Sequence, residues 1–240
     1  MAVGSALRAL CPCARFHIWL VRGWTFGYPL VMTTPALRIH FHPASYNARR
    51  TLAVAFHVGA PVEVVICDLM SGAQGSPEFR ALNPNGMVPV LEDGDFVLWE
   101  SMAITQYLAE KYPSSVWPAD ARVRADITRW QAWDLAHFGR AADVLLFENR
   151  LRGMFGLGAP NEVAVAQAEA AFSKHAKVLD VQLASRNYVV GDTLTLADFS
   201  LAGTFGSATY AGAPVAGFAN VARWYKQMQE LPAWERVSKT

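Results

Sequence analysis

The stretch Asn83-Pro84-Asn85-Gly86-Met87-Val88-Pro89-Val90-Leu91 decides the fold of this chain. Its Asn-Pro and Asn-Gly dipeptides indicate a turn, and the apolar, β-prone residues after them indicate a short strand that contains a proline. Because proline cannot donate to a strand ladder, we expect a cis Val88–Pro89 bond in a tight turn. Such a turn would leave the backbone of Val88 free to pair with an extended peptide.

A second stretch, Leu98-Trp99-Glu100-Ser101, ends a further strand and leads into a helix whose apolar face begins at Ile104. The two strands form a hairpin. A helix start carries free N–H groups, and Ser101 adds a hydroxyl, so this place suits a carboxylate. A free backbone edge beside a carboxylate site is the arrangement expected of a receptor for a small acidic peptide.

Upstream of the turn, the pattern predicts one strand–helix–strand unit. Leu37-Arg38-Ile39-His40-Phe41 alternates as a strand does, residues 47–57 have helical spacing, and residues 61–66 form a second strand. This spacing requires parallel strands with a right-handed crossover. With the hairpin and the helix that ends near Tyr112, the order is thioredoxin-like.

Downstream, the character of the chain changes to helical. Residues 122–152 and 162–185 carry the longest helical periods, and the glycine-rich residues 153–160 separate them. We therefore predict an α/β plus all-α protein, a thioredoxin-like N-terminal domain followed by a helical bundle domain. The predicted division is an extension outside the fold (residues 1–35), a thioredoxin-like domain (36–112), a linker (113–121) and an all-helical domain (122–240).

The N-terminal residues differ in composition from the rest of the chain. No Asp or Glu precedes Glu63, whereas Arg8, Arg15 and Arg22 fall in the first 31 residues. A transit peptide, a genuine N-terminal segment and an over-extended start with translation beginning near Met32 all fit this composition.

Bulk properties exclude several classes of protein. The chain has 240 residues, 52% hydrophobic and 17% charged, with a formal charge of +1, which gives no electrostatic case for nucleic acid. No apolar run approaches the roughly 18 to 20 residues of a membrane helix. Three cysteines, Cys11, Cys13 and Cys67, are too few for a disulfide scaffold, so we expect a cytoplasmic protein. No metal-ligand set emerges, and Cys67 is expected to be a buried hydrophobe.

The motifs Asn83-Pro84, Val88-Pro89, Glu100-Ser101 and Ala103-Ile104-Thr105-Gln106-Tyr107-Leu108 together resemble the signature of the glutathione transferase superfamily. The resemblance extends from about Leu37 to the C-terminus. It implies that the backbone around Val88, flanked by Met87 and Pro89, pairs with the cysteinyl part of glutathione. It also implies that Glu100 and Ser101 hold the γ-glutamyl end.

The segment His42-Pro43-Ala44-Ser45-Tyr46-Asn47-Ala48-Arg49-Arg50 resembles the serine-type members, such as the phi class. Ser45 stands where the first strand meets the first helix, so a thiolate there would meet a hydroxyl donor and the positive end of the helix dipole. The Ser45-x-Asn47 pattern also resembles bacterial nu-class members, some of which reduce disulfides. Asn47 is either a second contact to the sulfur or a helix cap. Met87 departs from the family pattern, which often has a polar side chain there.

A pocket for the electrophile is expected between the two domains. Tyr46, Trp130, Trp133, His137 and Phe138 are its candidate lining. Trp130, Trp133 and His137 also suit a core or a subunit interface, because their helical spacing places them on one face.

One further carboxylate, Asp198, is expected to be structural. In Thr195-Leu196-Ala197-Asp198 it is placed to accept from the Thr195 N–H as a capping box.

We therefore predict a glutathione transferase that conjugates glutathione, as co-substrate and without a further cofactor, to small apolar electrophiles. The resemblance also implies a homodimer. A glutathione-dependent disulfide or peroxide reductase, and a non-catalytic binding or scaffold protein of the same fold, are the alternatives.

Overall fold

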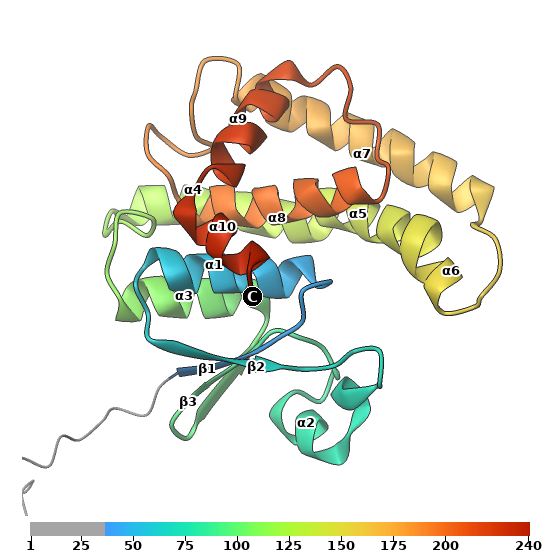
Figure 1. Ribbon diagram of the computed structural model, residues 1–240. Coiled ribbons are helices and arrows are strands. Elements are labelled where there is room, and N and C mark those ends of the chain that lie inside the picture. The colour runs from blue at the N-terminus through green and yellow to red at the C-terminus, as the bar shows by residue number, and fades with distance from the viewer. Residues whose placement is uncertain (1–36) are drawn as a thin grey trace, which may run out of the picture. The chain divides into compact units, whose positions relative to one another are not determined.

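The computed structural model of the protein describes residues 37–240 (Figure 1). The predicted extension, with Cys11 and Cys13, lies outside the described residues. The described part packs as one compact unit, so the thioredoxin-like and helical parts share contacts.

A four-stranded sheet organises the first part of this unit. Its strand order is β2-β1-β3-β4, with β1 and β2 parallel and the other two pairs antiparallel. The bounds are Leu37–Phe41 for β1, Val62–Ile66 for β2, Val90–Asp93 for β3 and Phe96–Trp99 for β4. This confirms the predicted thioredoxin-like order of strand, helix, strand, hairpin and helix.

Two helices cover one face of the sheet and a third lies on the other (Figure 1). The first face carries α1 (Tyr46–His57) and α3 (Ser101–Lys111), and the opposite face carries α2 (Pro77–Leu82). Leu37, Ile39 and Phe41 of β1 are buried in the core, which is why the central strand is apolar at alternate positions.

The second part is helical throughout. Its elements are α4 (Ala121–Trp133), η2 (Asp134–Phe138), α5 (Gly139–Leu146), η3 (Phe147–Leu151), α6 (Arg152–Met154), α7 (Glu162–Gln182), α8 (Leu196–Tyr210), α9 (Ala219–Gln229) and α10 (Pro232–Ser238). The predicted helical run over residues 122–152 is therefore one continuous path, and η2 and η3 are π-helical turns within it. Such turns insert an extra residue into a helix and recur at functional sites.

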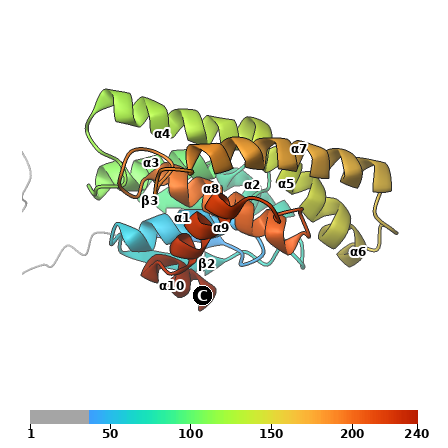
Figure 2. The same ribbon diagram turned by 90° about the horizontal axis from the view of Figure 1, so that it is seen from above.

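The central helix α8 lies against α1, so it joins the two parts (Figure 2). It is buried on almost every side, as a helix that is apolar all round must be. Gly203 permits the close approach, since a Cβ there would lie 3.2 Å from the Cβ of Arg50.

The structure differs from the sequence prediction in two places. Pro89 precedes β3, which begins at Val90, so the proline stands at the entrance of the strand and not inside it. The sequence reading also omitted α2, although Ser76 caps this helix through Phe79 N at 3.1 Å and Pro77 occupies its first position. Both residues are ordinary signals of a helix start.

The capping role expected for Asp198 is confirmed. Its carboxylate is fully buried and accepts from the backbone N–H and the hydroxyl of Thr195, each at 2.9 Å. Val189 N and Trp224 Nε1 donate to it at the same distance. The residue therefore ties the start of α8 to the loop before it and to α9.

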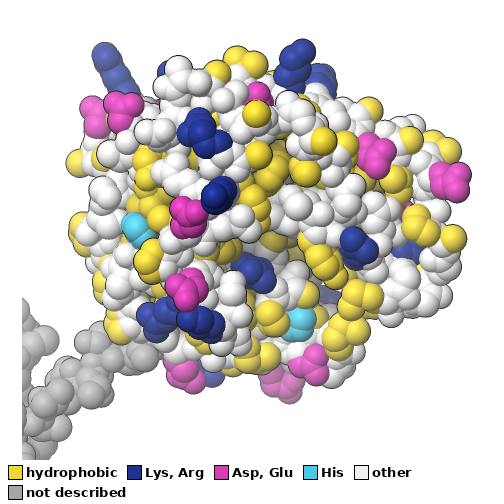
Figure 3. Space-filling view, turned by 45° about the horizontal axis from the view of Figure 1, so that its top comes forward, with side chains coloured by type: hydrophobic (Ala, Val, Ile, Leu, Met, Phe, Trp, Pro, Cys, Tyr) yellow, Lys and Arg dark blue, Asp and Glu magenta, His cyan; other side chains and the backbone are white. Residues whose placement is uncertain are grey.

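No helix in the described part of the chain combines the length and apolarity needed to cross a membrane. On the face shown in Figure 3, acidic and basic side chains are scattered among hydrophobic ones, with no large area of one sign.

Candidate active site

The turn before β3 presents the backbone expected to bind a peptide. The Val88–Pro89 bond is cis, as predicted. Asn83 holds the turn from inside, because its Nδ2 donates to the Met87 carbonyl at 2.8 Å and its Oδ1 accepts from Asn85 N at 3.0 Å. The side chain of Val88 is buried, while its backbone N–H and C=O have no hydrogen-bond partner among residues 37–240.

Gly86 is required in this turn by its surroundings. Its φ is +63°, a conformation that side chains rarely adopt, and a Cβ there would lie 2.9 Å from the Gln74 carbonyl oxygen. Met87 is 66% exposed, so only its backbone contributes to the shape of the turn.

The start of α3 has the features of an anion site. Glu100 precedes it with φ +72°, a strained conformation for a residue with a side chain. No side chain caps the helix, so the N–H groups of its first turn stay available to a carboxylate. Ser101 is buried.

Ser45 is the N-cap of α1. Its hydroxyl oxygen accepts from Ala48 N at 3.2 Å, which satisfies one free N–H of the first turn. Because a hydroxyl has one hydrogen to donate and the oxygen is already an acceptor here, the O–H of Ser45 can point away from the helix toward an anion. The helix dipole favours negative charge at the same place.

Of the two roles considered for Asn47, the structure excludes the helix cap, since Ser45 fills that position. Its Oδ1 accepts from Nη2 of Arg50 and lies 3.4 Å from the Ser101 hydroxyl. Asn47 therefore joins the start of α1 to the start of α3 through a buried network.

Arg50 is the centre of that network, and the sequence prediction assigned it no role. It is 1% exposed. Its Nε and Nη2 donate to Ser101 Oγ at 3.2 and 3.0 Å, and its Nη1 donates to Asp134 Oδ2 at 2.8 Å. One guanidinium thus links α1, α3 and the π-helical turn η2.

The carboxylate of Asp134 completes this buried ion pair. Its Oδ2 also accepts from Thr204 Oγ1 of α8 at 3.1 Å. Burial raises the pKa of Asp134 to about 6, and Arg50 opposes that rise. The pair holds the starts of α1 and α3 against the helical part of the protein.

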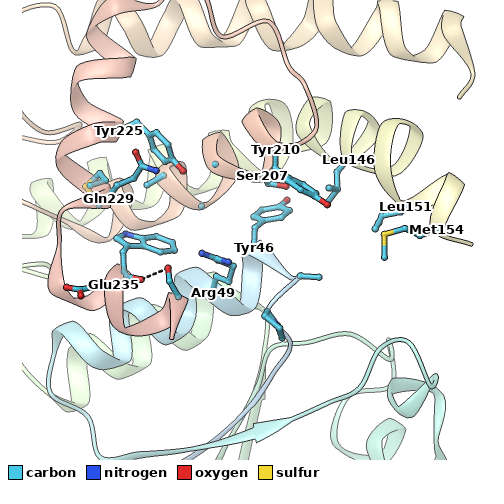
Figure 4. A pocket seen from close by; sticks show the side chains of 18 residues that line it. Tyr46, Arg49, Leu146, Leu151, Met154, Ser207, Tyr210, Tyr225, Gln229 and Glu235 are labelled. Atoms are coloured by element: carbon cyan, nitrogen blue, oxygen red, sulfur yellow. Dashed lines mark hydrogen bonds between the residues drawn. The ribbon is translucent and has the colours of Figure 1, made fainter. Parts of the chain in front are cut away.

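A cavity of about 640 Å³ is lined by Ala44 and Tyr46, the chain neighbours of Ser45. Pro43, Ala44, Tyr46 and Arg49 form the wall on the α1 side, and residues of α5, η3, α6, α8, α9 and α10 form the rest. Figure 4 shows side chains from these distant segments turned toward one space, with Tyr46 near its centre. The Tyr46 hydroxyl donates to Asp143 Oδ1 at 2.8 Å, and burial raises the pKa of this tyrosine above its usual range.

Of the residues expected to line the electrophile pocket, the cavity contains Tyr46. Trp130, Trp133, His137 and Phe138 lie elsewhere, on α4 and η2 facing α7. Trp133 stacks on Phe138 and meets His175 of α7 edge-on, while His137 stacks on His175. The alternative interpretation of the stripe as core fits Trp130, which is buried, and Phe138 is buried as well.

The pocket residues that the sequence did not indicate come mostly from the C-terminal helices. They include Arg49, Leu146, Tyr210, Tyr225, Gln229 and Trp234. Apolar and aromatic residues on helices read equally well as core in a sequence, so no local signal distinguished them.

Two other expectations concern metal and thiol chemistry. Within residues 37–240 no group of three or more potential ligands is placed to hold a metal ion. Cys67 is buried and unpaired, and burial raises the pKa of its thiol, so it is a poor nucleophile at neutral pH.

Comparison with known proteins identifies the family. Residues 36–110 match the family described as "Glutathione S-transferase, N-terminal domain", and residues 162–227 match "Glutathione S-transferase, C-terminal domain". The curated protein "Glutathione S-transferase 3" of Zea mays is 35% identical over 208 residues, which are 84% of this chain and 92% of that protein.

Solved structures give the same result. Glutathione transferase F7 from Populus trichocarpa superposes with a TM-score of 0.79 at 25% identity, over 85% of this chain and 98% of that one. The theta class enzyme from Xanthomonas axonopodis pv. citri, solved with glutathione bound, gives 0.77 at 28% identity over 86% and 98%. The chain therefore belongs to the glutathione S-transferase superfamily.

Proposed function

We propose that this protein is a glutathione transferase of the serine type, which transfers glutathione as its thiolate to small apolar electrophiles. The observation that carries the proposal is the state of Ser45. Its oxygen accepts from Ala48 N at 3.2 Å, which leaves its O–H free to donate to a thiolate, and its chain neighbours Ala44 and Tyr46 line a large cavity.

The chemical task is to stabilise the thiolate. A free thiol has a pKa of about 8.5, so only a few per cent is ionised at neutral pH. Each unit by which the pKa falls corresponds to about 1.4 kcal/mol of preferential stabilisation of the anion. The Ser45 hydroxyl and the start of α1 supply this stabilisation, and the cavity places an electrophile beside the sulfur.

The tripeptide is held by groups that the fold leaves without internal partners. The Val88 backbone pairs with the cysteinyl unit as an added strand would. The first-turn N–H groups of α3 bind the γ-glutamyl carboxylate. Ser101 is the first residue of this turn, and Glu100 faces the amino group of the ligand. Asn47 acts through Arg50 and Ser101, and so positions this end of the site without touching the sulfur.

The remaining parts of the proposal are a role in detoxification, a homodimer and a cytoplasmic location. The family supports the first two, and the small number of cysteines supports the third. Light scattering during size-exclusion chromatography measures the dimer directly.

The test combines binding and product analysis on one sample. Calorimetry with glutathione measures binding, and 1-chloro-2,4-dinitrobenzene measures turnover, with mass spectrometry to identify the product. Binding with a thioether product supports the proposal. Oxidised glutathione as the sole product, from a disulfide or peroxide substrate, would favour a reductase. No binding at millimolar glutathione would leave a non-catalytic scaffold of the same fold.

A further inference from the structure

We propose that the electrophile pocket selects aromatic electrophiles that carry a carboxylate, and that Arg49 is the residue that recognises this group. The inference rests on the proposed transferase function and assigns its substrate class.

Arg49 is the cation of an otherwise largely apolar cavity. It lies on α1, one helical turn after Ser45, and contributes to the cavity wall. Residues one turn apart share a helix face and are separated by about 6 Å along the axis. A para-substituted benzene ring spans a comparable distance, so its reacting carbon can meet the sulfur at Ser45 while its far substituent reaches Arg49.

The guanidinium of Arg49 has no hydrogen bond or ion pair with a side chain of the part of the chain that the structure describes. The nearby acids are otherwise engaged. Glu235, also on the cavity wall, is exposed and pairs with Lys239 at 2.6 Å, and Asp143 accepts from Tyr46. The adjacent Arg50 points into the buried network and not into the cavity. A half-buried cation without a counter-ion is a ready partner for an anionic ligand.

The neighbours of Arg49 favour a planar carboxylate. Figure 4 shows Arg49 directed into the space bounded by Tyr46, Tyr225 and Gln229. The Tyr225 hydroxyl and the Gln229 amide have no hydrogen bond within residues 37–240, so they can serve as additional donors. Burial raises the pKa of Tyr225, which keeps its hydroxyl protonated and able to donate. A guanidinium binds a carboxylate through two parallel N–H bonds.

The walls around this polar group suit an aromatic ring. Tyr46, Tyr210 and Trp234 come from three different helices and enclose the cavity. Flat aromatic walls favour a flat aromatic ligand by offset stacking. Contact with a low-dielectric wall also strengthens the pairing of the carboxylate with Arg49.

The reaction tested is an aromatic substitution. The thiolate sulfur of glutathione forms a bond to the ring carbon that carries chlorine, and chloride leaves with the electron pair of the broken bond. The substrate pair is 4-chloro-3,5-dinitrobenzoate and its methyl ester, which differ in the charge at the far end of the ring. Each kcat/KM is divided by the uncatalysed rate constant of the same compound, which removes the difference in intrinsic reactivity.

The experiment compares the acid-to-ester ratio of these corrected values in the full chain and in three variants. Arg49→Gln is expected to lower the ratio roughly tenfold to hundredfold, the range of a hydrogen-bonded charged group. Arg49→Lys is expected to restore much of it, since the charge is kept. Arg122→Gln, which removes an equal charge from the exposed start of α4, is the matched control and should keep the wild-type ratio. The KM for glutathione, measured with the ester as electrophile, shows whether Arg49 also contributes to binding of the tripeptide.

The outcomes are distinguishable. An acid-to-ester ratio that is the same in the wild type and in Arg49→Gln overturns this inference and leaves the transferase proposal intact. A fall in the ratio that occurs equally in Arg122→Gln overturns it too, because the effect would then be general electrostatics. An Arg49→Gln variant whose main defect is a raised KM for glutathione assigns Arg49 to the tripeptide instead. Absence of thioether from both substrates with the wild type would overturn the transferase function itself.

Discussion

The hydroxyl oxygen of Ser101 lies 3.0 Å from Nη2 and 3.2 Å from Nε of Arg50. A buried guanidinium on α1 therefore fixes the first residue of α3, the helix start expected to hold the γ-glutamyl end of glutathione. The same guanidinium meets Asp134 of the helical part. The proposed peptide site is thus supported from the second part of the protein and not from the sheet alone.

Replacement of Arg50 by Met is expected to lower the free energy of unfolding by about 3–5 kcal/mol, because it leaves the carboxylate of Asp134 buried without its cation. Chemical denaturation measures the loss. Arg129→Met removes an exposed partner of Asp126 and should change stability by less than about 1 kcal/mol. The double variant Arg50→Met/Asp134→Leu should recover part of the loss. Equal stability of the wild type and Arg50→Met would show that the pair contributes nothing.

Replacement of Ser45 by Ala is expected to raise the pKa of the acid limb in the pH profile of kcat/KM by about one to two units. A hydrogen bond to a charged group contributes about 1.5–3 kcal/mol, and each pKa unit corresponds to about 1.4 kcal/mol. The rate at pH 6.5 therefore falls, while the dissociation constant of glutathione changes little. The profile is measured with 1-chloro-2,4-dinitrobenzene at saturating glutathione.

Because Ser45 also caps α1, its loss should cost about 1 kcal/mol of stability. Ser76→Ala is the matched control, since Ser76 caps α2 in the same way and stands outside the proposed machinery. It should lose similar stability without a shift of the kinetic pKa. A pH profile of Ser45→Ala that superimposes on the wild type would remove Ser45 from the mechanism.

Replacement of Tyr46 by Phe is expected to leave the kinetic pKa where it is in the wild type. Burial raises the pKa of this phenol, so it stays protonated from pH 6 to 9 and contributes no limb to the profile. Its hydroxyl donates a hydrogen bond to Asp143 Oδ1 at 2.8 Å and is therefore not directed at a thiolate. The same pH series checks this. A rise of the kinetic pKa in Tyr46→Phe as large as that in Ser45→Ala would make the tyrosine the sulfur donor.

The sequence predicts the parts of this site that are encoded by neighbours in the chain. The cap at Ser45 depends on the three residues after it, and the Val88–Pro89 turn on the five before it. The helix start at Ser101 is likewise local. In each case the side chain or backbone group is placed by turn and helix geometry, so a short motif was sufficient.

The parts that the sequence did not predict are set by contacts between distant segments. Arg50 meets partners 51, 84 and 150 residues away, and an arginine on an amphipathic helix reads as exposed until its partners are known. Trp130 and Trp133 have the spacing of a pocket wall, yet they pack on each other, and Trp133 contacts Phe138 and His175 instead of lining the cavity. Tyr225 and Trp234 reach the pocket because α9 packs on α8 and α10 packs on α1.

Replacement of Gly206 by Ala is expected to alter the electrophile pocket without altering the glutathione site. A Cβ at this position would lie 2.5 Å from the Tyr225 hydroxyl oxygen, so the tyrosine must move. We expect the KM for 1-chloro-2,4-dinitrobenzene to change about threefold or more, whereas stability need not fall because alanine favours the helix by about 1 kcal/mol.

Adding Tyr225→Phe removes the clashing oxygen and should return the KM toward the wild-type value. Gly75→Ala is the control, because a Cβ there meets nothing within 4 Å. Steady-state kinetics with each substrate varied in turn separates the two KM values. A change confined to the KM for glutathione would contradict the assignment of this cavity to the electrophile.

Replacement of Asp198 by Ala is expected to lower stability and spare the chemistry. The fully buried carboxylate accepts four hydrogen bonds, and each donor left without a partner costs about 1–3 kcal/mol. We therefore expect a loss of at least about 3 kcal/mol in the free energy of unfolding. Well below the unfolding transition, glutathione affinity and the kinetic pKa should stay at the wild-type values.

The control for Asp198 is Asp120→Ala, which removes an exposed N-cap that accepts from Arg122 N and Val123 N. This substitution should lower the free energy of unfolding by about 1 kcal/mol. The difference in stability loss between the two variants then measures the effect of burying the hydrogen-bonded carboxylate, apart from the effect of capping a helix. Thermal and chemical denaturation are run beside the turnover assay on the same preparations. Lost activity with an unchanged melting temperature in Asp198→Ala would reverse the assignment and place this carboxylate among the catalytic groups.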